Sequence, residues 1–373
     1  MRVADFESFE QPAVPIKPLE NVMTWLRQSW YQIGWSTDLE GGQRLARTIL
    51  EEPIVVFRSG DGQLHALFDR CPHRFAPLSR GTISERGITC GYHGLSFGKD
   101  GHCLDNPHGP ITSRMRVRAY PVMERHTAIW VWMGDAEKAD PSALPDLSFI
   151  DETPAAAQIH MYMPTKANYE LAADNILDLS HTDYLHPTSL GGIMTGSKAS
   201  IWEEGDALVS EWQATACDPP PAYKPIVPTG KADIWTQVRW HAPALMVLGT
   251  SAKPTGVPRE RADEAYTLHN MVPETSTTTH YFVCNTRRFM LDSAEFSELL
   301  RGAITGAFQD EDKPMLEDQQ LRMGTPDLWE LDPLLLKVDA GAVRVRRKLA
   351  AMIVAEQGEG GAGPVLEEKT IPV

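Results

Sequence analysis

A segment spanning residues 71–93 holds two cysteines and two histidines at a spacing that suits metal binding. Cys71 and His73 are followed, after sixteen residues, by Cys90 and His93. Both pairs lie at expected turns between β-like runs, and two tight loops of one small β domain can meet at their tips. Four ligands from these two loops would then converge on one centre.

Two kinds of centre accept two cysteines and two histidines. Zinc binds them in a closed tetrahedron. A Rieske 2Fe–2S cluster takes two thiolates on one iron and two imidazoles on the other. Zinc fingers usually pair Cys with Cys and His with His, whereas here each loop contributes one of each and can serve both irons. The order favours the Rieske cluster over zinc, and both over a chance grouping.

The segment NILDLSHTDYLHP, which begins at Asn175, is a second candidate site. On an α-helix Asn175, Asp178 and His181 follow at three-residue steps and lie within about 120° of one face. His186 is roughly 140° round from His181, so a continuous helix would not aim both rings at one ion. Because Pro187 disfavours the α conformation at His186, we expect the helix to end there. Both rings can then share a metal.

Both motifs resemble those of the Rieske non-haem iron aromatic oxygenases, in their oxygenase (alpha) component. In the first motif Arg74 follows the first histidine and GYHGLSF follows the second cysteine. The pattern D-x-x-H-x-x-x-x-H, about ninety residues later, resembles the mononuclear iron motif of that family. The resemblance covers most of residues 28–325. The C-terminal half is similar to the group of vanillate O-demethylase, dicamba O-demethylase and toluenesulfonate methyl-monooxygenase, in IWTQVRWHAPALM, TLHNMVPET, THYFVCNTRRF and EDKPMLE.

The resemblance implies a mononuclear iron held by His181, His186 and one carboxylate. In the family this carboxylate is the Asp of an E-D-x-x-x-x-E pattern on a late helix. That pattern matches Asp312 here, within FQDEDKPMLEDQQ, and Asp310 is its nearest rival. Pro314 removes a helical hydrogen bond to the Asp310 carbonyl and is expected to bend the helix. Three other acids are expected on a solvated helix face: Asp310, Glu311 and Asp318.

Asp178 is not needed on the iron, because a three-ligand site leaves positions open for O2. In the family the matching aspartate bridges the two centres of neighbouring subunits in a head-to-tail trimer. The resemblance therefore implies that Asp178 links His181 to His93 of another chain, as carboxylates commonly hold ligating histidines. Asn175 is expected near the iron. Asp183 has no expected role.

The resemblance implies a terminal oxygenase that uses O2 and electrons from NAD(P)H to hydroxylate a methyl or methoxy group of an aromatic acid. O-demethylation with release of formaldehyde is the leading reaction. No G-x-G-x-x-G opening a βαβ unit and no four-cysteine cluster motif occur, so a separate flavin and plant-type 2Fe–2S reductase, or a ferredoxin, is expected. Aryl-methyl or ring hydroxylation is the alternative. An electron-transfer ferredoxin-like protein and a structural zinc protein are more remote.

The substrate pocket is less defined. His241 and His269 occupy strand positions where members of the group place polar substrate contacts, and a structural role is equally compatible with each. Enzymes of the dicamba type carry a Trp nine residues before the ligand Asp, where this chain has Ala303. A pocket shaped for dicamba itself is therefore not expected. An apolar wall is expected from four residues: Met246, Leu248, Ile304 and Phe308.

The remaining pattern predicts an α+β chain with two domains. Short β-like runs with turn signals predict an all-β Rieske domain over residues 28–135. A mixed α/β catalytic domain with an antiparallel sheet of the helix-grip type is expected over residues 150–357. It has β-like runs over 207–285 and expected helices at 167–185, 292–323 and 333–356. Residues 1–28 are expected to be a lead-in, and residues 358–373 a flexible tail.

Composition and charge exclude several classes of protein. The 373 residues carry a net charge of −15, which argues against nucleic acid as a partner and suits solubility or a basic partner. No apolar run is long enough to cross a membrane, and the first residues lack the apolar segment of a signal peptide. The five cysteines do not form the pattern of a disulfide framework: Cys71, Cys90, Cys103, Cys217 and Cys284. We expect a cytoplasmic protein.

Overall fold

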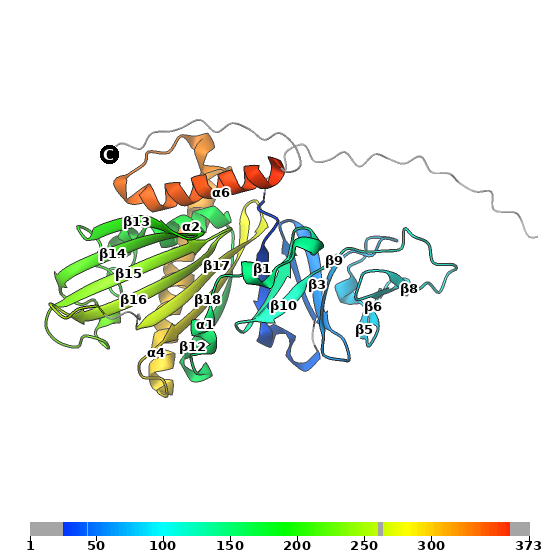
Figure 1. The fold of residues 1–373 in the computed structure, drawn as a ribbon, viewed down its shortest axis with the longest axis horizontal. Helices are drawn as coiled ribbons and strands as arrows, with labels where there is room; N and C mark the ends of the chain where they lie inside the picture. Colours follow the sequence, from blue (N-terminus) through cyan, green and yellow to red (C-terminus); the bar gives the residue numbers. More distant parts are fainter. Residues whose placement is uncertain (1–24, 43, 260–263, 359–373) are drawn as a thin grey trace, which may run out of the picture.

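The structure is a computed structural model that describes residues 25–42, 44–259 and 264–358. Residues 359–373 of the predicted tail (358–373) and residues 1–24 of the predicted lead-in (1–28) lie outside the described residues. Figure 1 shows a large sheet at the left, with the long C-terminal helix above it, and several smaller sheets to its right. The four-stranded sheet of residues 82–105 forms the right-hand end of the described chain.

The N-terminal part is built from three small antiparallel sheets, as the short β-like runs predicted. The first has the order β1-β11-β10: Trp30–Trp35, Ala128–Trp132 and Val122–Arg125. The second has the order β2-β3-β4-β9: Arg44–Ile49, Glu52–Arg58, Leu64–Phe68 and Ala119–Tyr120. The third has the order β5-β6-β7-β8: Thr82–Ser84, Gly87–Thr89, Ser96–Gly98 and Cys103–Asp105.

The C-terminal part is organised around one seven-stranded antiparallel sheet, which confirms the predicted fold class. Its order is β12-β18-β17-β16-β15-β14-β13. The strands are Gln158–Thr165 (β12), Lys198–Glu204 (β13), Ala207–Cys217 (β14), Ala232–His241 (β15), Leu245–Pro254 (β16), Ala265–Thr275 (β17) and Thr278–Arg287 (β18). Successive side chains of a strand point to opposite faces, so one face can line a site while the other packs.

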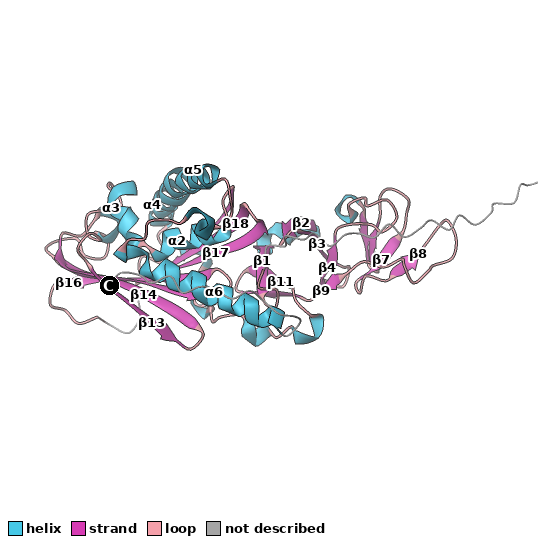
Figure 2. Cartoon of the chain, turned by 90° about the horizontal axis from the view of Figure 1, so that it is seen from above, coloured by secondary structure: helices cyan, strands magenta, loops and turns pink. Residues whose placement is uncertain are grey.

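Helices from three parts of the chain pack beside this sheet (Figures 1 and 2). The α-helices are Ser148–Asp151 (α1), Tyr169–Leu177 (α2), Thr182–Leu185 (α3), Ala294–Ile304 (α4), Lys313–Met323 (α5) and Ala340–Gly358 (α6). Between α4 and α5 lies a π-helical segment, η8 (Thr305–Asp312). The 3-10 segments nearest the site are η6 (Leu179–His181) and η10 (Lys337–Asp339).

One predicted helix start is confirmed by the structure, and another is wrong. The Ser293 side chain accepts a hydrogen bond from the Phe296 N–H and caps α4, as the predicted start at residue 292 or 293 requires. The predicted helix start at residue 333 is wrong, because α6 begins only at Ala340. The Asp339 carboxylate accepts from the Leu336 N–H at 2.5 Å, and such local bonds compete with helix formation.

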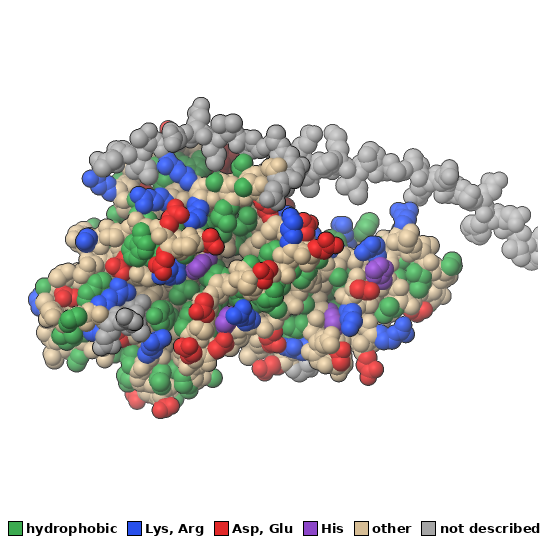
Figure 3. Space-filling model, in the orientation of Figure 1, with side chains coloured by type: hydrophobic (Ala, Val, Ile, Leu, Met, Phe, Trp, Pro, Cys, Tyr) green, Lys and Arg blue, Asp and Glu red, His purple; other side chains and the backbone are tan. Residues whose placement is uncertain are grey.

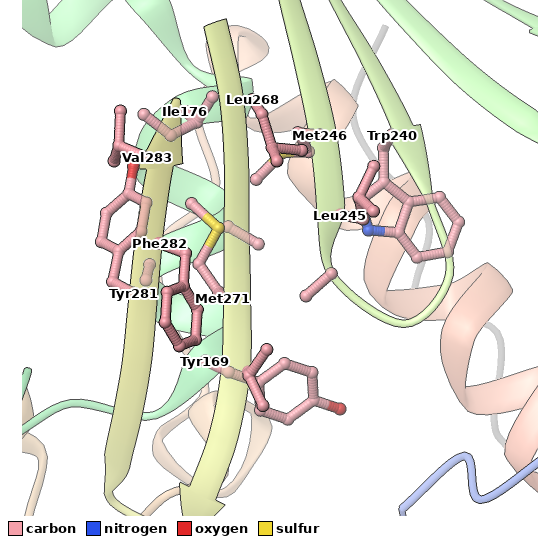
Figure 4. Close-up of a cluster of buried hydrophobic side chains, with 14 of the residues drawn as sticks. Tyr169, Ile176, Trp240, Leu245, Met246, Leu268, Met271, Tyr281, Phe282 and Val283 are labelled. Atoms are coloured by element: carbon pink, nitrogen blue, oxygen red, sulfur yellow. The ribbon is translucent and has the colours of Figure 1, made fainter. Parts of the chain in front are cut away.

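One continuous apolar core joins the β1-β11-β10 sheet to the large sheet. It includes Trp132 on one side and Phe282 on the other, and Figure 4 shows Phe282 and Met271 side by side within it. Each large side chain buried there contributes about 1.5–3 kcal/mol. Trp25 and Leu26 are buried in this core, so the lead-in predicted to reach residue 28 ends earlier.

Acidic and basic side chains are interspersed on the face that Figure 3 shows, despite the net charge of −15. Within the described residues, no helix combines the length and the apolar character that crossing a bilayer requires.

Candidate metal centres and substrate cavity

The two Cys/His loops repeat the same backbone geometry. The Cys71 N–H bonds to the carbonyl five residues on, and the Cys71 carbonyl accepts from the N–H of Phe75. Cys90 makes the same two bonds, the second with Gly94. Phe75 and Gly94 both have positive φ, at 59° and 78°, which the tight turn requires and which Gly adopts without strain. The two loops, which share this geometry, can therefore each present one cysteine and one histidine in the same way.

The four side chains suit a two-iron cluster better than a single ion. Both cysteines are buried, whereas the His73 ring is exposed and lies 4.4 Å from the His93 ring between centroids. A tetrahedral zinc site would draw its ligand atoms to within roughly 4 Å of one another. Among the described residues, no three of these four ligand atoms meet within 4.8 Å. A wider centre, with thiolates inside and imidazoles at the tip, fits this arrangement.

Burial also affects the thiols. It raises the pKa of Cys71 to about 11, so the free thiol is protonated at neutral pH, and only a bound metal would hold it as thiolate.

The second centre is formed by His181, His186 and Asp312. Their ligand atoms all lie within 4.8 Å of one another, the only such group in the described part of the chain. The Asp312 Oδ1 lies 3.1 Å from the His186 Nε2 and 3.5 Å from the His181 Nε2. The rival Asp310 is exposed and outside this group.

The site has the electrostatics of a cation site. Asp312 and His186 are each 1% exposed, and the Asp312 Oδ2 has no hydrogen-bond partner. Burial alone would raise the pKa of Asp312, but hydrogen bonds and charge from the two histidines outweigh it and lower this pKa to about 2. A buried carboxylate with a free oxygen beside two imidazoles fits Fe(II).

The helical segment predicted over residues 167–185 is interrupted at Asp178. This residue is extended, with φ −107° and ψ 92°, and separates α2 from η6. Its carboxylate accepts from the Ser180 N–H at 2.9 Å, while its main-chain carbonyl contacts the His181 Nδ1 at 2.5 Å. Within one chain, the expected bond to His181 is therefore made by the backbone of Asp178. The carboxylate remains partly exposed.

The end of the helix before His186 is as expected. α3 stops at Leu185, and His186 leaves the helical region, with φ −117° and ψ 45°. Asn175 lies at the site, where its Nδ2 donates to the Asp312 Oδ1 at 3.1 Å. The irregularity expected near Pro314 takes the form of the π segment η8, which ends at Asp312. Such segments are frequent at functional sites.

Glu311 was assigned to a solvated face, and this prediction is wrong. Its Oε2 lies 2.5 Å from the His186 Nδ1, while the other ring nitrogen faces Asp312. The His186 ring thus sits between two consecutive acids. Ligating histidines commonly donate their second N–H to a carboxylate, and the adjacent Glu-Asp pair is the signal that would have identified this contact.

Asp183, which had no expected role, holds a loop. Its Oδ1 accepts from the N–H groups of Gly192, Ile193 and Met194 at 2.7 to 3.1 Å, and its Oδ2 accepts from Thr195 at 2.6 Å. Met194 lines the cavity described below. The carboxylate therefore couples the metal-site segment to one wall of that cavity.

Asp183→Ala is expected to destabilise the protein by about 2–4 kcal/mol, because hydrogen bonds to a charged group are the strong ones. Urea unfolding of the metal-loaded protein measures this. Asp318→Ala is the control, since Asp318 is exposed and, within the described part of the chain, its carboxylate pairs with Arg322 of the same helix. Its effect should stay within about 0.5 kcal/mol. Equal effects of both variants would contradict the assigned role.

A cavity of about 190 Å³ lies beside the second centre. Its floor is one face of the large sheet, where the register sets side chains in three rows across β15 to β18. The rows are Trp240, Met246, His269 and Val283; then Val238, Leu248, Thr267 and Asn285; then Thr236, Thr250, Ala265 and Arg287. The whole third row lines the cavity, together with Leu248, Thr267, Asn285 and His269 of the other two. Helix α4 and η8 supply an opposite wall with Phe296, Leu300, Ala303, Ile304 and Phe308.

The expected pocket residues divide into two groups. His269, Ala303, Leu248, Ile304 and Phe308 line the cavity, whereas His241 and Met246 are absent from its described lining. His241 ends β15, and burial lowers its pKa to about 4. His241 lies on the opposite face of the sheet from His269, which its strand position alone could not tell, whereas Met246 pairs with His269 and still lies outside the lining.

His269 lines the cavity and has one buried ring nitrogen without a hydrogen-bond partner. Burial lowers its pKa to about 3, so the ring is neutral. Its Nδ1 lies 2.7 Å from the hydroxyl of Tyr281, whose pKa burial raises, and its Nε2 has no partner. A buried hydroxyl needs an acceptor, so Tyr281 donates to Nδ1 and the proton of the ring sits on Nε2.

Comparison with known proteins gives a consistent result over both halves. Residues 29–121 match the Rieske [2Fe-2S] domain, and residues 165–355 match the vanillate O-demethylase oxygenase C-terminal domain. The oxygenase component of chloroacetanilide N-alkylformylase from Rhizorhabdus wittichii is 35% identical over 340 residues, which cover 89% of this chain and 97% of the relative. The oxygenase component of dicamba O-demethylase from Stenotrophomonas maltophilia is 34% identical, covering 88% and 97%.

A solved structure supports the same family assignment. Dicamba monooxygenase bound to 3,6-dichlorosalicylic acid superposes with a TM-score of 0.83 at 31% identity, covering 89% of this chain and 99% of that one. Both domain matches, the relatives and the shared architecture lead to one conclusion. The chain belongs to the Rieske non-haem iron oxygenases, as an oxygenase component of the vanillate and dicamba O-demethylase group.

Proposed function

We propose that this chain hydroxylates a methyl or methoxy carbon of an aromatic acid, with O-demethylation and release of formaldehyde as its leading reaction. The observation that carries the proposal is the group of His181, His186 and Asp312 beside an apolar cavity. A cavity of about 150 Å³ already admits benzene, so about 190 Å³ suits one substituted ring. The relatives are named as O-demethylases and an N-alkylformylase.

Cys71, Cys90, His73 and His93 would hold a Rieske cluster, which would supply electrons one at a time. His181, His186 and Asp312 would hold an iron(II) ion, which would supply the activation of O2. The chain's own residues orient the ligands and the substrate. Glu311 and the Asp178 carbonyl fix the second nitrogens of His186 and His181. The cavity walls exclude water and hold the ring. The His269 Nε2–H serves as a donor to a polar substituent.

We also propose a homotrimer in which the cluster of one chain serves the iron of the next. The small sheet with β7 and β8 and the helix α3 lie at opposite ends of the molecule (Figure 2), so the two centres of one chain are far apart. Exposed aromatics flank the cluster tip, with Phe75 at 67% and Tyr92 at 65% exposure. A second hollow, lined by Asp178, His181 and the exposed Leu334, receives that tip.

The relatives are oxygenase components, so a partner that supplies electrons is part of the system. We propose a reductase that draws on NAD(P)H, and a cytoplasmic setting. The five cysteines, none of which forms a disulfide, support a reducing compartment. We further propose domain limits near residues 28–135 and 150–357, close to the matched ranges.

The test is a panel of methoxy- and methyl-benzoates with the purified protein, a reductase and NADH, with formaldehyde and hydroxymethyl products measured. About three irons per chain with a Rieske EPR signal are expected. Formaldehyde identifies O-demethylation, whereas hydroxymethyl or ring-hydroxylated products identify the alternative. Zinc in place of iron, or two irons without O2 consumption on any aromatic acid, would overturn the proposal.

A further inference from the structure

Arg287, the last residue of β18, is a buried cation without an anionic partner. It is 1% exposed. Its Nη2 donates to the Met290 carbonyl at 2.9 Å and the Ser297 Oγ at 2.8 Å, while Nε and Nη1 have no partner. Among the described residues no carboxylate forms an ion pair with it. A buried charge is costly unless paired, so this arrangement calls for an anion from outside the chain.

Arg287 lies at one end of the cavity. It stands in the row with Thr236, Thr250 and Ala265, two rows from His269. At about 3.3 Å per residue, four residues along β18 separate these rows by roughly 13 Å. The opposite end, at His269, is the one next to the metal ligands, because the His269 ring lies 5.1 Å from the ring of Phe308, which belongs to the π segment ending at Asp312.

The neighbours of Arg287 suit an anion carried on an aromatic ring. Phe289 and Phe296 line this end of the cavity, and the guanidinium lies 5.2 Å from the Phe296 ring centroid. In the next row the Asn285 amide pairs with the Thr267 Oγ1 at 2.8 Å and leaves its Oδ1 without a partner. Because Thr267 can donate as well as accept, this amide can turn and present its N–H groups instead.

We propose that Arg287 binds the carboxylate or sulfonate of the aromatic substrate, at the end of the cavity remote from the iron. The inference rests on the proposed function and sharpens its substrate class. Charge-assisted bonds to a guanidinium are strong and directional, and the desolvated cation becomes paired when substrate enters. The anionic group and the reacting alkyl group then lie on opposite sides of the ring. Para-substituted acids fit this geometry, whereas ortho-substituted acids hold both groups at one edge.

The experiment compares 4-methoxybenzoate, 4-methoxybenzamide, 2-methoxybenzoate and toluene-4-sulfonate with the metal-loaded enzyme, by equilibrium binding and by turnover. Arg287→Gln is expected to raise Kd and KM for 4-methoxybenzoate at least about tenfold, with the amide changed less than about twofold. Arg287→Lys, which keeps the charge, should recover part of the loss. The sulfonate arm shows which oxyanion the site prefers.

The matched control is Arg288→Gln, since Arg288 is adjacent, exposed and stacked over Tyr266. A purely structural role for Arg287 would weaken acid and amide equally, and that result overturns the inference. If the Arg287 variants do not fold, wild-type enzyme decides: equal binding of acid and amide, or tighter binding of the 2-methoxy than the 4-methoxy acid, overturns it. Selective binding of acids without turnover of any compound would instead contradict the proposed function alone.

Discussion

Asp312→Ala is expected to lower the iron content from about three per chain to about two and to reduce turnover roughly 1,000-fold or more. Asp312 is the one carboxylate in the group that meets within 4.8 Å, and it is almost fully buried. Without it, two neutral imidazoles must hold a divalent ion in an apolar surrounding, which disfavours the charge. Metal analysis and single-turnover oxidation of substrate measure both effects.

The Rieske EPR signal should survive this change, because Cys71 and Cys90 belong to a separate core cluster. Asp310→Ala is the matched control: it removes an acid two residues earlier that is exposed, and iron content and turnover should stay at the parental level. A variant at position 312 that retains three irons would show that another residue completes the site.

Asp178→Asn is expected to leave all irons in place and to lower turnover by about 10- to 100-fold or more. An amide Oδ1 can still accept from the Ser180 N–H, and the carbonyl that contacts the His181 Nδ1 is part of the backbone. The substitution therefore removes only the charge of a partly exposed carboxylate. If that carboxylate carries the link between subunits, electron transfer to the iron slows while the site stays intact.

Rapid reduction of the cluster followed by its reoxidation in the presence of substrate measures this step directly. Asp339→Asn is the control, because Asp339 lines the same hollow and its oxygen accepts a main-chain N–H in the same way. Reoxidation at the parental rate in the Asp178 variant would exclude the bridge. Equal slowing in both variants would point to the shape of the hollow instead.

The sequence by itself determined the types and the local geometry of the candidate metal-binding residues. The Cys-x-His and Cys-x-x-His loops and the His181/His186 pair are short-range patterns, and local rules suffice for them. Pro187 disfavours the α conformation at His186, and Ser293 starts α4 by capping it. Short strands with turn signals likewise predicted the small sheets. All of these depend on residues within a few positions of one another.

Only the tertiary structure decided which distant residues meet. Several acids follow Phe308, and the packing of η8 brings Asp312 and Glu311 to His186 while leaving Asp310 exposed. Strand register, a long-range property, separates His269, which lines the cavity, from His241, which does not. The same register sets Arg287 at the far end of that cavity. Contacts between residues more than a hundred positions apart arise because these residues are buried around one shared core. No local sequence pattern predicts such contacts.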